Sequence, residues 1–152
     1  RNYDMLIKHV SDEPLNAYAW YQLGQTLSHM TLFVEAEKAI RFAIELGKLS
    51  DPVFASASAT LSQLVGNKRN FSESLLWAEK SLEKAPKQVY AMNLKAYSLL
   101  YLGRFEEAEE AFMETLRRIR AKKGVPQSGF DIDIPDSVVL DGLRKAKDRN
   151  NK

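Results

Sequence analysis

At 152 residues the chain is long enough for one domain, and its 45% hydrophobic residues can form a continuous core. The formal net charge of only +2 gives no overall field that would attract nucleic acid, so we expect no nucleic-acid partner. Cysteine is absent, which excludes disulfides, thiolate metal sites and cysteine nucleophiles, and it fits the cytoplasmic location that we expect. No apolar run approaches the ~20 residues of a membrane span, so no membrane partner is expected.

In chain order, the sequence predicts short helices separated by tight turns. Residues 2–10 have the pattern of the second helix of a hairpin whose first helix is missing. Three helical hairpins follow, at about 16–47, 52–84 and 88–122, because apolar residues recur there at spacings of three and four. A proline precedes each hairpin, where a helix can begin without losing a hydrogen bond; these are Pro14, Pro52 and Pro86.

The C-terminal part differs in composition. Residues 124–135 are predicted to be a linker, which ends the repeat array of residues 1–123. A final helix is expected over 136–149, with Val139, Leu143 and Ala146 on one side. Because a stack of hairpins leaves its last apolar stripe exposed, we interpret this helix as a cap. A flexible tail or a partner-binding segment is the alternative.

An internal repeat connects the hairpins. Steps of 38 and then 34 residues relate Phe33 to Phe71 and Phe105, and the same two steps relate many other positions. All four extra residues of the longer step fall between Ile44 and Pro52. One shift in one linker, with everything else in register, indicates a true repeat and therefore an all-α fold of stacked hairpins.

The repeat unit resembles that of the tetratricopeptide repeat (TPR) family over roughly residues 2–118. The first copy has Trp20, Leu23, Gly24, Ala36 and Ala43 at the positions that mark the family, and the third has Gly103, Phe105, Ala108 and Phe112. The second copy is degenerate, with Ser58, Ser62 and Ser74 at marked positions, and Lys95 replaces a leucine in the third. The resemblance implies a right-handed α-solenoid and a non-catalytic module for protein–protein interaction.

Residues for chemistry are missing from the pattern. The sequence has no glycine-rich phosphate loop, no GxSxG elbow and no HExxH motif. Its two histidines, His9 and His29, lie on different repeats and lack a third metal ligand. We therefore predict no catalytic residues, no metal and no cofactor, and a protein that is not an enzyme.

The family resemblance also implies a binding face, because the first helices of successive repeats line a concave groove. Tyrosine offers contact area and a hydroxyl, and asparagine or glutamine can pair with a peptide backbone. Small residues in the second copy should leave a hollow between two tyrosine-rich walls. The candidate peptide-binding residues are Tyr18, Tyr21, Gln25, Gln63, Asn67, Tyr90, Asn93, Tyr97 and Tyr101.

An alternative interpretation is that these tyrosines only pack against neighbouring helices. If they do bind a peptide, replacing Tyr21 and Tyr97 together by alanine should abolish binding and leave helicity and melting nearly intact.

Two other functions stay open beside the binding of a protein or peptide. The chain could be an accessory TPR segment of a larger bacterial enzyme such as a glycosyltransferase, because its first residue is Arg and its Glu45–Asp51 linker loosely resembles theirs. It could also be a self-associating scaffold. In that case a homo-oligomer would form through the N-terminal half repeat, whose stripe of Met5, Leu6 and Val10 we expect to be uncovered.

Overall fold

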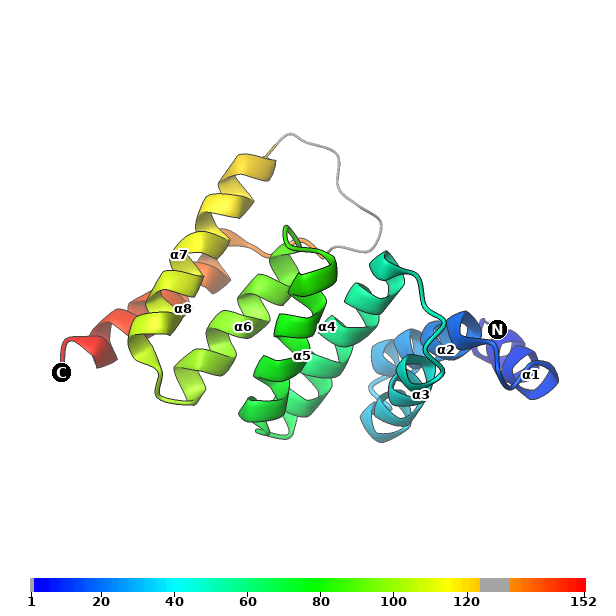
Figure 1. Ribbon diagram of the computed structural model, residues 1–152. Coiled ribbons are helices and arrows are strands. Elements are labelled where there is room, and N and C mark those ends of the chain that lie inside the picture. Colours follow the sequence, from blue (N-terminus) through cyan, green and yellow to red (C-terminus); the bar gives the residue numbers. More distant parts are fainter. Residues whose placement is uncertain (1, 124–131) are drawn as a thin grey trace.

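Eight α-helices and no strands make up the part of the chain that this computed structural model describes, residues 2–123 and 132–152 (Figure 1). The prediction of an all-α solenoid of helical hairpins is confirmed. The predicted linker at 124–135 lies largely outside the described residues. The helices are α1 (Asn2–Asp12), α2 (Ala17–His29), α3 (Phe33–Glu45), α4 (Asp51–Asn67), α5 (Phe71–Lys84), α6 (Val89–Tyr101), α7 (Phe105–Lys122) and α8 (Asp136–Asn150).

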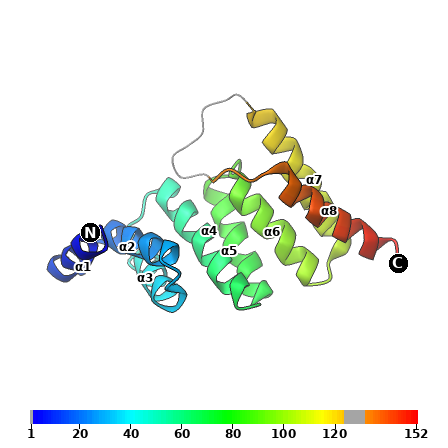
Figure 2. The same cartoon turned by 180° about the vertical axis from the view of Figure 1, so that it is seen from behind.

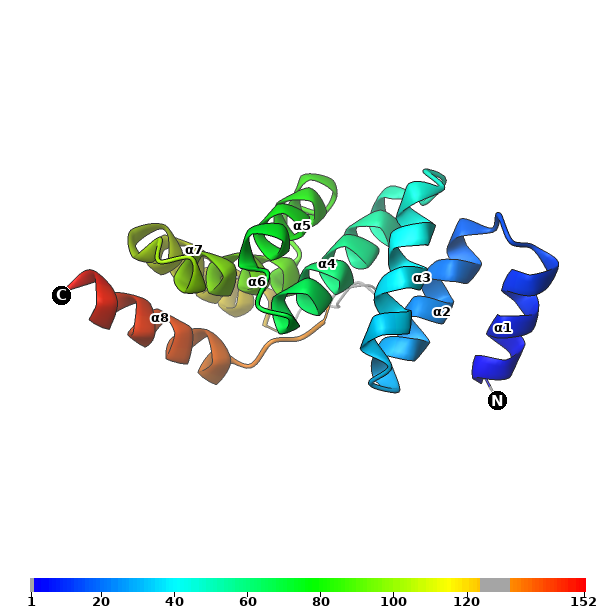
Figure 3. The ribbon, with the colours of Figure 1, turned by 90° about the horizontal axis from the view of Figure 1, so that it is seen from below.

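The helices form an elongated stack with the two termini at opposite ends (Figure 1). Three hairpins, α2–α3, α4–α5 and α6–α7, follow one another, and α1 and α8 flank them (Figure 2). Seen from below, α4, α6 and α8 lie along one side of the molecule, and α5 and α7 lie along the other (Figure 3). We call the face formed by α2, α4 and α6 the inner face, and the helices α1, α3, α5 and α7 the outer helices.

The turn inside each hairpin has the same backbone geometry. Thr31, Arg69 and Gly103, which the repeat steps relate, all have a positive φ, of 60°, 65° and 80°. A left-handed residue after a helix lets the next amide bond back to the last turn and so closes the helix end. Accordingly, the amides of Leu32, Asn70 and Arg104 donate to the carbonyls of Leu27, Val65 and Leu99 at 2.9, 3.0 and 2.9 Å.

Small residues set how closely the helices approach. At Gly24, a Cβ atom would lie 2.5 Å from Cδ1 of Ile40, so only glycine permits the observed contact of α2 with α3. Ala36 and Ala43 on the facing side of α3 are fully buried. Alanines and a glycine at the marked repeat positions therefore place the hairpin helices in contact, with the larger apolar residues filling the space between them.

The last helix continues the stack. Helix α8 packs on α7 and α6 as α6 packs on α5 and α4, so it takes the place of the first helix of a fourth repeat. Val139 and Ala146 are fully buried, and Gly142 lies so close to Phe112 that a Cβ would be 2.3 Å from its Cζ. Helix α8 thus covers the end of the third hairpin, as a capping helix should.

The N-terminal stripe differs from its prediction. Leu6 and Val10 are buried, because they pack on α2 against Leu23 and Leu27. Only Met5 of the three is exposed, at 62%. The expectation of an uncovered stripe was therefore wrong for Leu6 and Val10, since α1 uses them to join the stack. Self-association through this helix stays a prediction.

Candidate functional site

The nine predicted peptide-binding residues lie on α2, α4 and α6 and form two groups on the inner face. Tyr18, Tyr21 and Gln25 on α2 face the start of α4, whereas the other six lie on α4 and α6.

In the first group, Tyr21 is part of the core. Its side chain is 6% exposed and packs beside Ile40 and Ala43, and its hydroxyl lies 2.7 Å from the Ser56 hydroxyl of α4. Burial raises the pKa of Tyr21 above its usual value. Loss of this ring would leave a cavity, so we expect Tyr21→Ala to destabilise the protein, in contrast to the nearly intact melting predicted for the Tyr21→Ala, Tyr97→Ala double change.

The neighbours of Tyr21 are more accessible. Tyr18 is roughly half exposed, and its ring centroid lies 5.7 Å from that of Tyr21. Gln25 is half-buried and donates through Nε2 to the Tyr21 hydroxyl at 3.4 Å. Tyr18 therefore offers the ring of this group that a ligand can contact.

In the second group, Gln63 connects two other predicted residues. Its Oε1 accepts from the Tyr90 hydroxyl at 3.3 Å, and its Nε2 donates to Asn67 Oδ1 at 2.9 Å. Burial raises the pKa of Tyr90 to about 12, so this hydroxyl stays protonated at neutral pH. Helices α4 and α6 are thereby joined by a fixed polar link.

A pocket of about 220 Å³ lies between α4 and α6, and it contains four of the predicted residues. We call it the α4–α6 pocket. Gln63, Asn93, Tyr97 and Tyr101 line it, so it has tyrosines of the third copy, whereas the predicted hollow had tyrosine walls from both the first and the third copy. The remaining lining residues are Ser62, Gly66, Phe71, Ser74, Leu94 and Ser98.

Asn93 is the unusual residue of the pocket. Its side chain is 8% exposed, and its Oδ1 has no hydrogen-bond partner among the residues that the structure describes. A buried acceptor that loses water without gaining a donor costs roughly 1–3 kcal/mol. An N–H donor entering the pocket would supply the missing hydrogen bond.

Stacked aromatic rings form one wall of the pocket. Phe71 stacks on Tyr101 at 4.9 Å between centroids, and Tyr101 stacks on Tyr97 at 6.2 Å. Arg69 lies over the Phe71 ring, 5.4 Å from its centroid. Tyr101 is 49% exposed, so part of this wall can contact a ligand.

Tyr97 has a second role in the stack. Its hydroxyl donates to the Val138 carbonyl at the start of α8, at 2.6 Å, and its ring meets the edge of Phe112 at 4.8 Å. Burial, together with the negative charge of Asp141, raises the pKa of Tyr97. The interpretation that tyrosines pack between helices therefore applies to this residue, although one side of it still lines the pocket.

The sequence did not indicate Phe71 or the serines as pocket residues. Phe71 begins α5, an outer helix, whereas only first helices were expected to line the groove. Ser62, Ser74 and Ser98 are buried and hydrogen-bonded to one another, with Oγ–Oγ distances of 3.0 Å for Ser62–Ser74 and for Ser98–Ser74. Ser62 and Ser74, at the positions that hold Gly24 and Ala36 in the first copy, were the signal in the sequence.

The described part of the chain offers little for metal chemistry. No group of three or more His, Asp and Glu side chains in residues 2–123 and 132–152 is placed to hold a metal ion. His9 lies on α1, and its Nε2 is 3.0 Å from Oε2 of Glu13 in the turn after this helix. Among the described helices, none has the length and apolar character needed to span a membrane.

Solved structures provide the comparison. No protein-family model and no curated protein matches the chain. A crystal structure of MamA protein superposes with a TM-score of 0.67 at 16% identity, covering 99% of this chain and 81% of that one. A MamA RS-1 ArsTM double mutant gives 0.67 at 13% identity, with coverages of 98% and 83%.

YrrB, described as a TPR protein with an unusual peptide-binding site, superposes with a TM-score of 0.62 at 16% identity. The superposition covers 99% of this chain and 77% of YrrB. At such identities the likeness concerns the course of the backbone. This chain has the fold of a tetratricopeptide repeat protein.

Proposed function

We propose that the chain is a non-catalytic protein-interaction module that binds a polypeptide segment on its inner face, with the α4–α6 pocket as the centre of the site. The observation that carries this proposal is the buried, unpaired Oδ1 of Asn93 beside the half-exposed ring of Tyr101. A peptide can supply both a hydrogen-bond donor and a stacking partner. Its backbone or side-chain N–H donates to Asn93 Oδ1, and an adjacent group stacks on the Tyr101 ring. The peptide-binding site of YrrB, which has the same fold, supports a peptide as the ligand.

A displayed library of random linear peptides, selected on the wild-type protein, tests the proposal. Peptides that bind are then measured against Asn93→Leu, which removes the acceptor at similar volume, and against Tyr101→Ala. We expect each change to weaken binding roughly tenfold, equivalent to ~1.4 kcal/mol. Val34→Ala on α3, a similarly simple truncation of an exposed side chain, is the control and should bind as the wild type does.

If the selected peptides bind the Asn93→Leu and Tyr101→Ala variants with unchanged affinity, the site is elsewhere and the proposal is wrong. Circular dichroism of each variant must show the wild-type melting curve for this comparison to hold. Asn93→Asp serves as a second variant, since it keeps the acceptor and should retain binding better than leucine does.

A further inference from the structure

Between successive outer helices the fold leaves three equivalent grooves, α1–α3, α3–α5 and α5–α7. Steps of 34, 38 and 34 residues relate the outer helices along the chain, so equivalent lining positions can be compared directly. On the helix that forms the floor, these positions hold Trp20, Ser58 and Met92. On the second wall they hold Ala39, Trp77 and Ala111, and on the first wall Ile7, Arg41 and Glu79.

The α3–α5 groove is filled by the chain itself. Trp77 packs on the core between α3 and α4, and its Nε1 donates to Glu73 at 3.1 Å. Arg41 extends across the groove from α3. Its Nη2 forms an ion pair with Glu73 at 2.8 Å, and its Nε forms one with Glu37 at 2.9 Å. One indole and one guanidinium, both held by Glu73, therefore close this groove.

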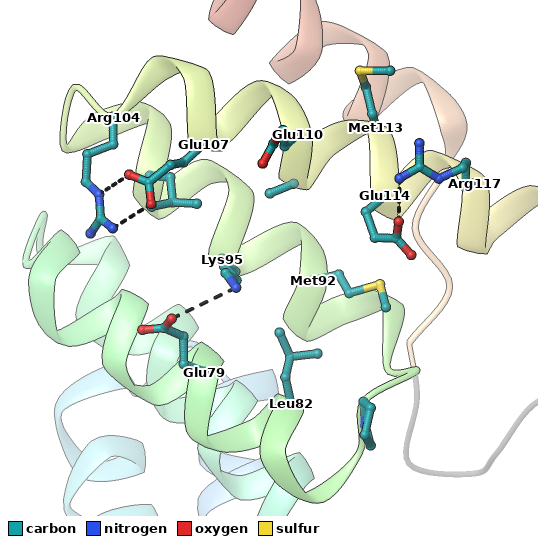
Figure 4. Close-up of a pocket in the computed structure, with 13 residues that line it drawn as sticks. Glu79, Leu82, Met92, Lys95, Arg104, Glu107, Glu110, Met113, Glu114 and Arg117 are labelled. Atoms are coloured by element: carbon teal, nitrogen blue, oxygen red, sulfur yellow. Dashed lines mark hydrogen bonds and ion pairs between the residues drawn. The ribbon is translucent and has the colours of Figure 1, made fainter.

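The α5–α7 groove lacks both of these groups. Ala111 stands in the position of Trp77, and Glu79 stands in the position of Arg41. The carboxylate that corresponds to Glu73 is kept, as Glu107. A cavity of about 770 Å³ results, compared with about 440 Å³ in the α1–α3 groove, where Trp20 and Phe42 take up space (Figure 4).

Apart from Lys95, the floor of the α5–α7 groove is apolar and adaptable. Leu82 and Met92 lie on one side of it, and Met113 lies on α7 opposite them (Figure 4). Unbranched methionines can change rotamer to fit a ring of varied shape, and their sulfur atoms contact aromatic rings favourably. This floor suits an aromatic side chain better than a polar one.

The rim of the groove is charged, with a small excess of acid. Glu107 is held by Arg104 at 2.6 Å, and Lys95 lies 3.9 Å from Glu79 (Figure 4). The carboxylate of Glu110 has no ion pair or hydrogen bond with another residue of the described chain. The lining contains four glutamates against one lysine and two arginines. Of the four glutamates in the lining, Glu110 is therefore the one that an entering cationic group can pair with.

We propose that the α5–α7 groove is a second docking site, for a polypeptide segment of a partner that brings an aromatic side chain and an arginine or lysine close together. The aromatic ring takes the space above Ala111 that Trp77 fills in the preceding groove. The cation faces Glu110, the carboxylate of the lining that has no ion pair within the described chain. The α3–α5 groove, in which Trp77 and Arg41 fill the corresponding space, is the precedent for this arrangement.

This site is independent of the proposed function, because the α5–α7 groove shares no lining residue with the α4–α6 pocket. One residue of the groove lining departs from the repeat pattern. Lys95 occupies a position that otherwise carries leucine, and it lies half-exposed on the floor of the groove. Ala111 leaves unfilled the space that a tryptophan closes one repeat earlier.

The four methionines of the chain allow a direct test, since Met92 and Met113 line the groove while Met5 and Met30 lie elsewhere. Random linear peptides are selected on the wild-type protein and titrated into protein labelled with ¹³C at the methionine methyl groups. We expect a subset of peptides, enriched in aromatic and basic residues, to shift the Met92 and Met113 signals and to leave Met5 and Met30 unchanged.

Two variants then test the chemistry. Ala111→Trp, which reproduces Trp77, should remove the shifts by filling the groove. Glu110→Lys, at an exposed position that leaves the fold intact, should weaken the same peptides roughly tenfold. Leu76→Trp, which adds an indole at an exposed position of α5, is the matched control for Ala111→Trp and should not change binding.

The proposal is overturned if no selected peptide shifts Met92 and Met113, if the peptides that do are acidic or lack aromatic residues, or if they bind Glu110→Lys as tightly as the wild type. Peptides that bind the inner face can be distinguished from peptides that bind the α5–α7 groove. They bind Asn93→Leu more weakly than the wild type, and they bind Ala111→Trp as tightly as the wild type. Failure of one site therefore leaves the result for the other unaffected.

Discussion

Tyrosine hydroxyls act in this protein mainly as ties between helices. Those of Tyr21, Tyr90 and Tyr97 bond to Ser56, Gln63 and the carbonyl of Val138, each on a different helix from the tyrosine itself. In contrast, Tyr18 and Tyr101 combine a place on the inner face with about half of their side-chain surface exposed. These two rings are therefore the ones that can contribute contact area to a ligand at little cost in stability.

The hydroxyl of Tyr90 should make the free energy of unfolding depend on pH in the alkaline range. Its pKa is about 12 in the folded protein, whereas an exposed tyrosine ionises near pH 10. The unfolded chain therefore loses this proton first, so the stabilisation is complete below pH 10 and declines as the pH rises toward 12. We expect the free energy of unfolding to fall by about 1 kcal/mol more in the wild type than in Tyr90→Phe between pH 9 and pH 11.

Urea unfolding at several pH values measures this difference. The Tyr90→Phe variant lacks the ionisable group, so other residues that titrate in the same range affect both proteins equally and cancel. Parallel pH profiles for the two proteins would contradict a raised pKa for Tyr90.

At the scale of elements, the second repeat replaces apolar helix contacts by polar ones. Ser62 donates to the Ser74 carbonyl at 2.7 Å, and Ser74 donates to the Ser62 carbonyl at 2.9 Å, which joins α4 to α5. Ser98 of α6 reaches the same Ser74 hydroxyl. Each of these three hydroxyls has a partner, so Ser62 and Ser74 keep the close helix approach of glycine and alanine without an unpaired hydroxyl of their own. The Ser58 hydroxyl of the same repeat, in contrast, is buried without a partner among the described residues.

The docking of α8 depends on a missing side chain. Gly142 lies against the ring of Phe112, and a Cβ there would be 2.3 Å from Cζ. Phe112 is fully buried, so its ring has little room to move. We expect Gly142→Ala to destabilise the protein by about 1–3 kcal/mol, although alanine favours helices, because overpacking outweighs propensity here.

Thermal melting followed by circular dichroism measures this change. Ser137→Ala, at an exposed position of the same helix, is the control and should leave melting within error of the wild type. A Gly142→Ala variant that melts at or above the wild-type temperature would show that the α7–α8 contact can relax.

At the scale of the whole molecule, stability comes from contacts between neighbours in the stack. Three of the core clusters join adjacent hairpins, through pairs such as Leu23 and Leu64, Tyr21 and Leu61, and Ala59 and Leu94. A further cluster joins the third hairpin to α8, through Ala96 and Val139. Contacts of this kind make the ends of a solenoid decisive, since a terminal hairpin has a neighbour on one side only. Helix α8 supplies the missing neighbour at the C-terminal end.

Removal of residues 124–152 should therefore expose the third hairpin. Phe112 and Leu116 are buried by the cluster that contains Val139 and Ala146, and their exposure should cost on the order of 3 kcal/mol. We expect a lower urea midpoint and stronger binding of a hydrophobic dye. Removal of Asn151 and Lys152 alone is the control, and an unchanged midpoint in the longer deletion would contradict a capping role.

The sequence by itself determined the fold. The repeat steps, the prolines and the helical spacing of apolar residues show which segments are helices and which helix faces are buried. Both properties depend on the spacing of residues along the chain. Gly24, Ala36 and Ala43, visible in the sequence as marked repeat positions, proved to be where α2 and α3 come close. Even the inner-face pocket was partly predictable, since Asn93 and Tyr101 sit at positions set by the repeat frame.

Only the tertiary structure decided which of those side chains are free. Tyr21 and Tyr97 have the same sequence signal as Tyr101, but Ser56 and Val138 take their hydroxyls. Likewise, the α5–α7 groove exists because Ala111 and Glu79, distant in sequence, replace a tryptophan and an arginine that meet across two helices. Which side chains are buried and which have hydrogen-bond partners depends on how neighbouring repeats pack. A pattern within one repeat does not contain that information.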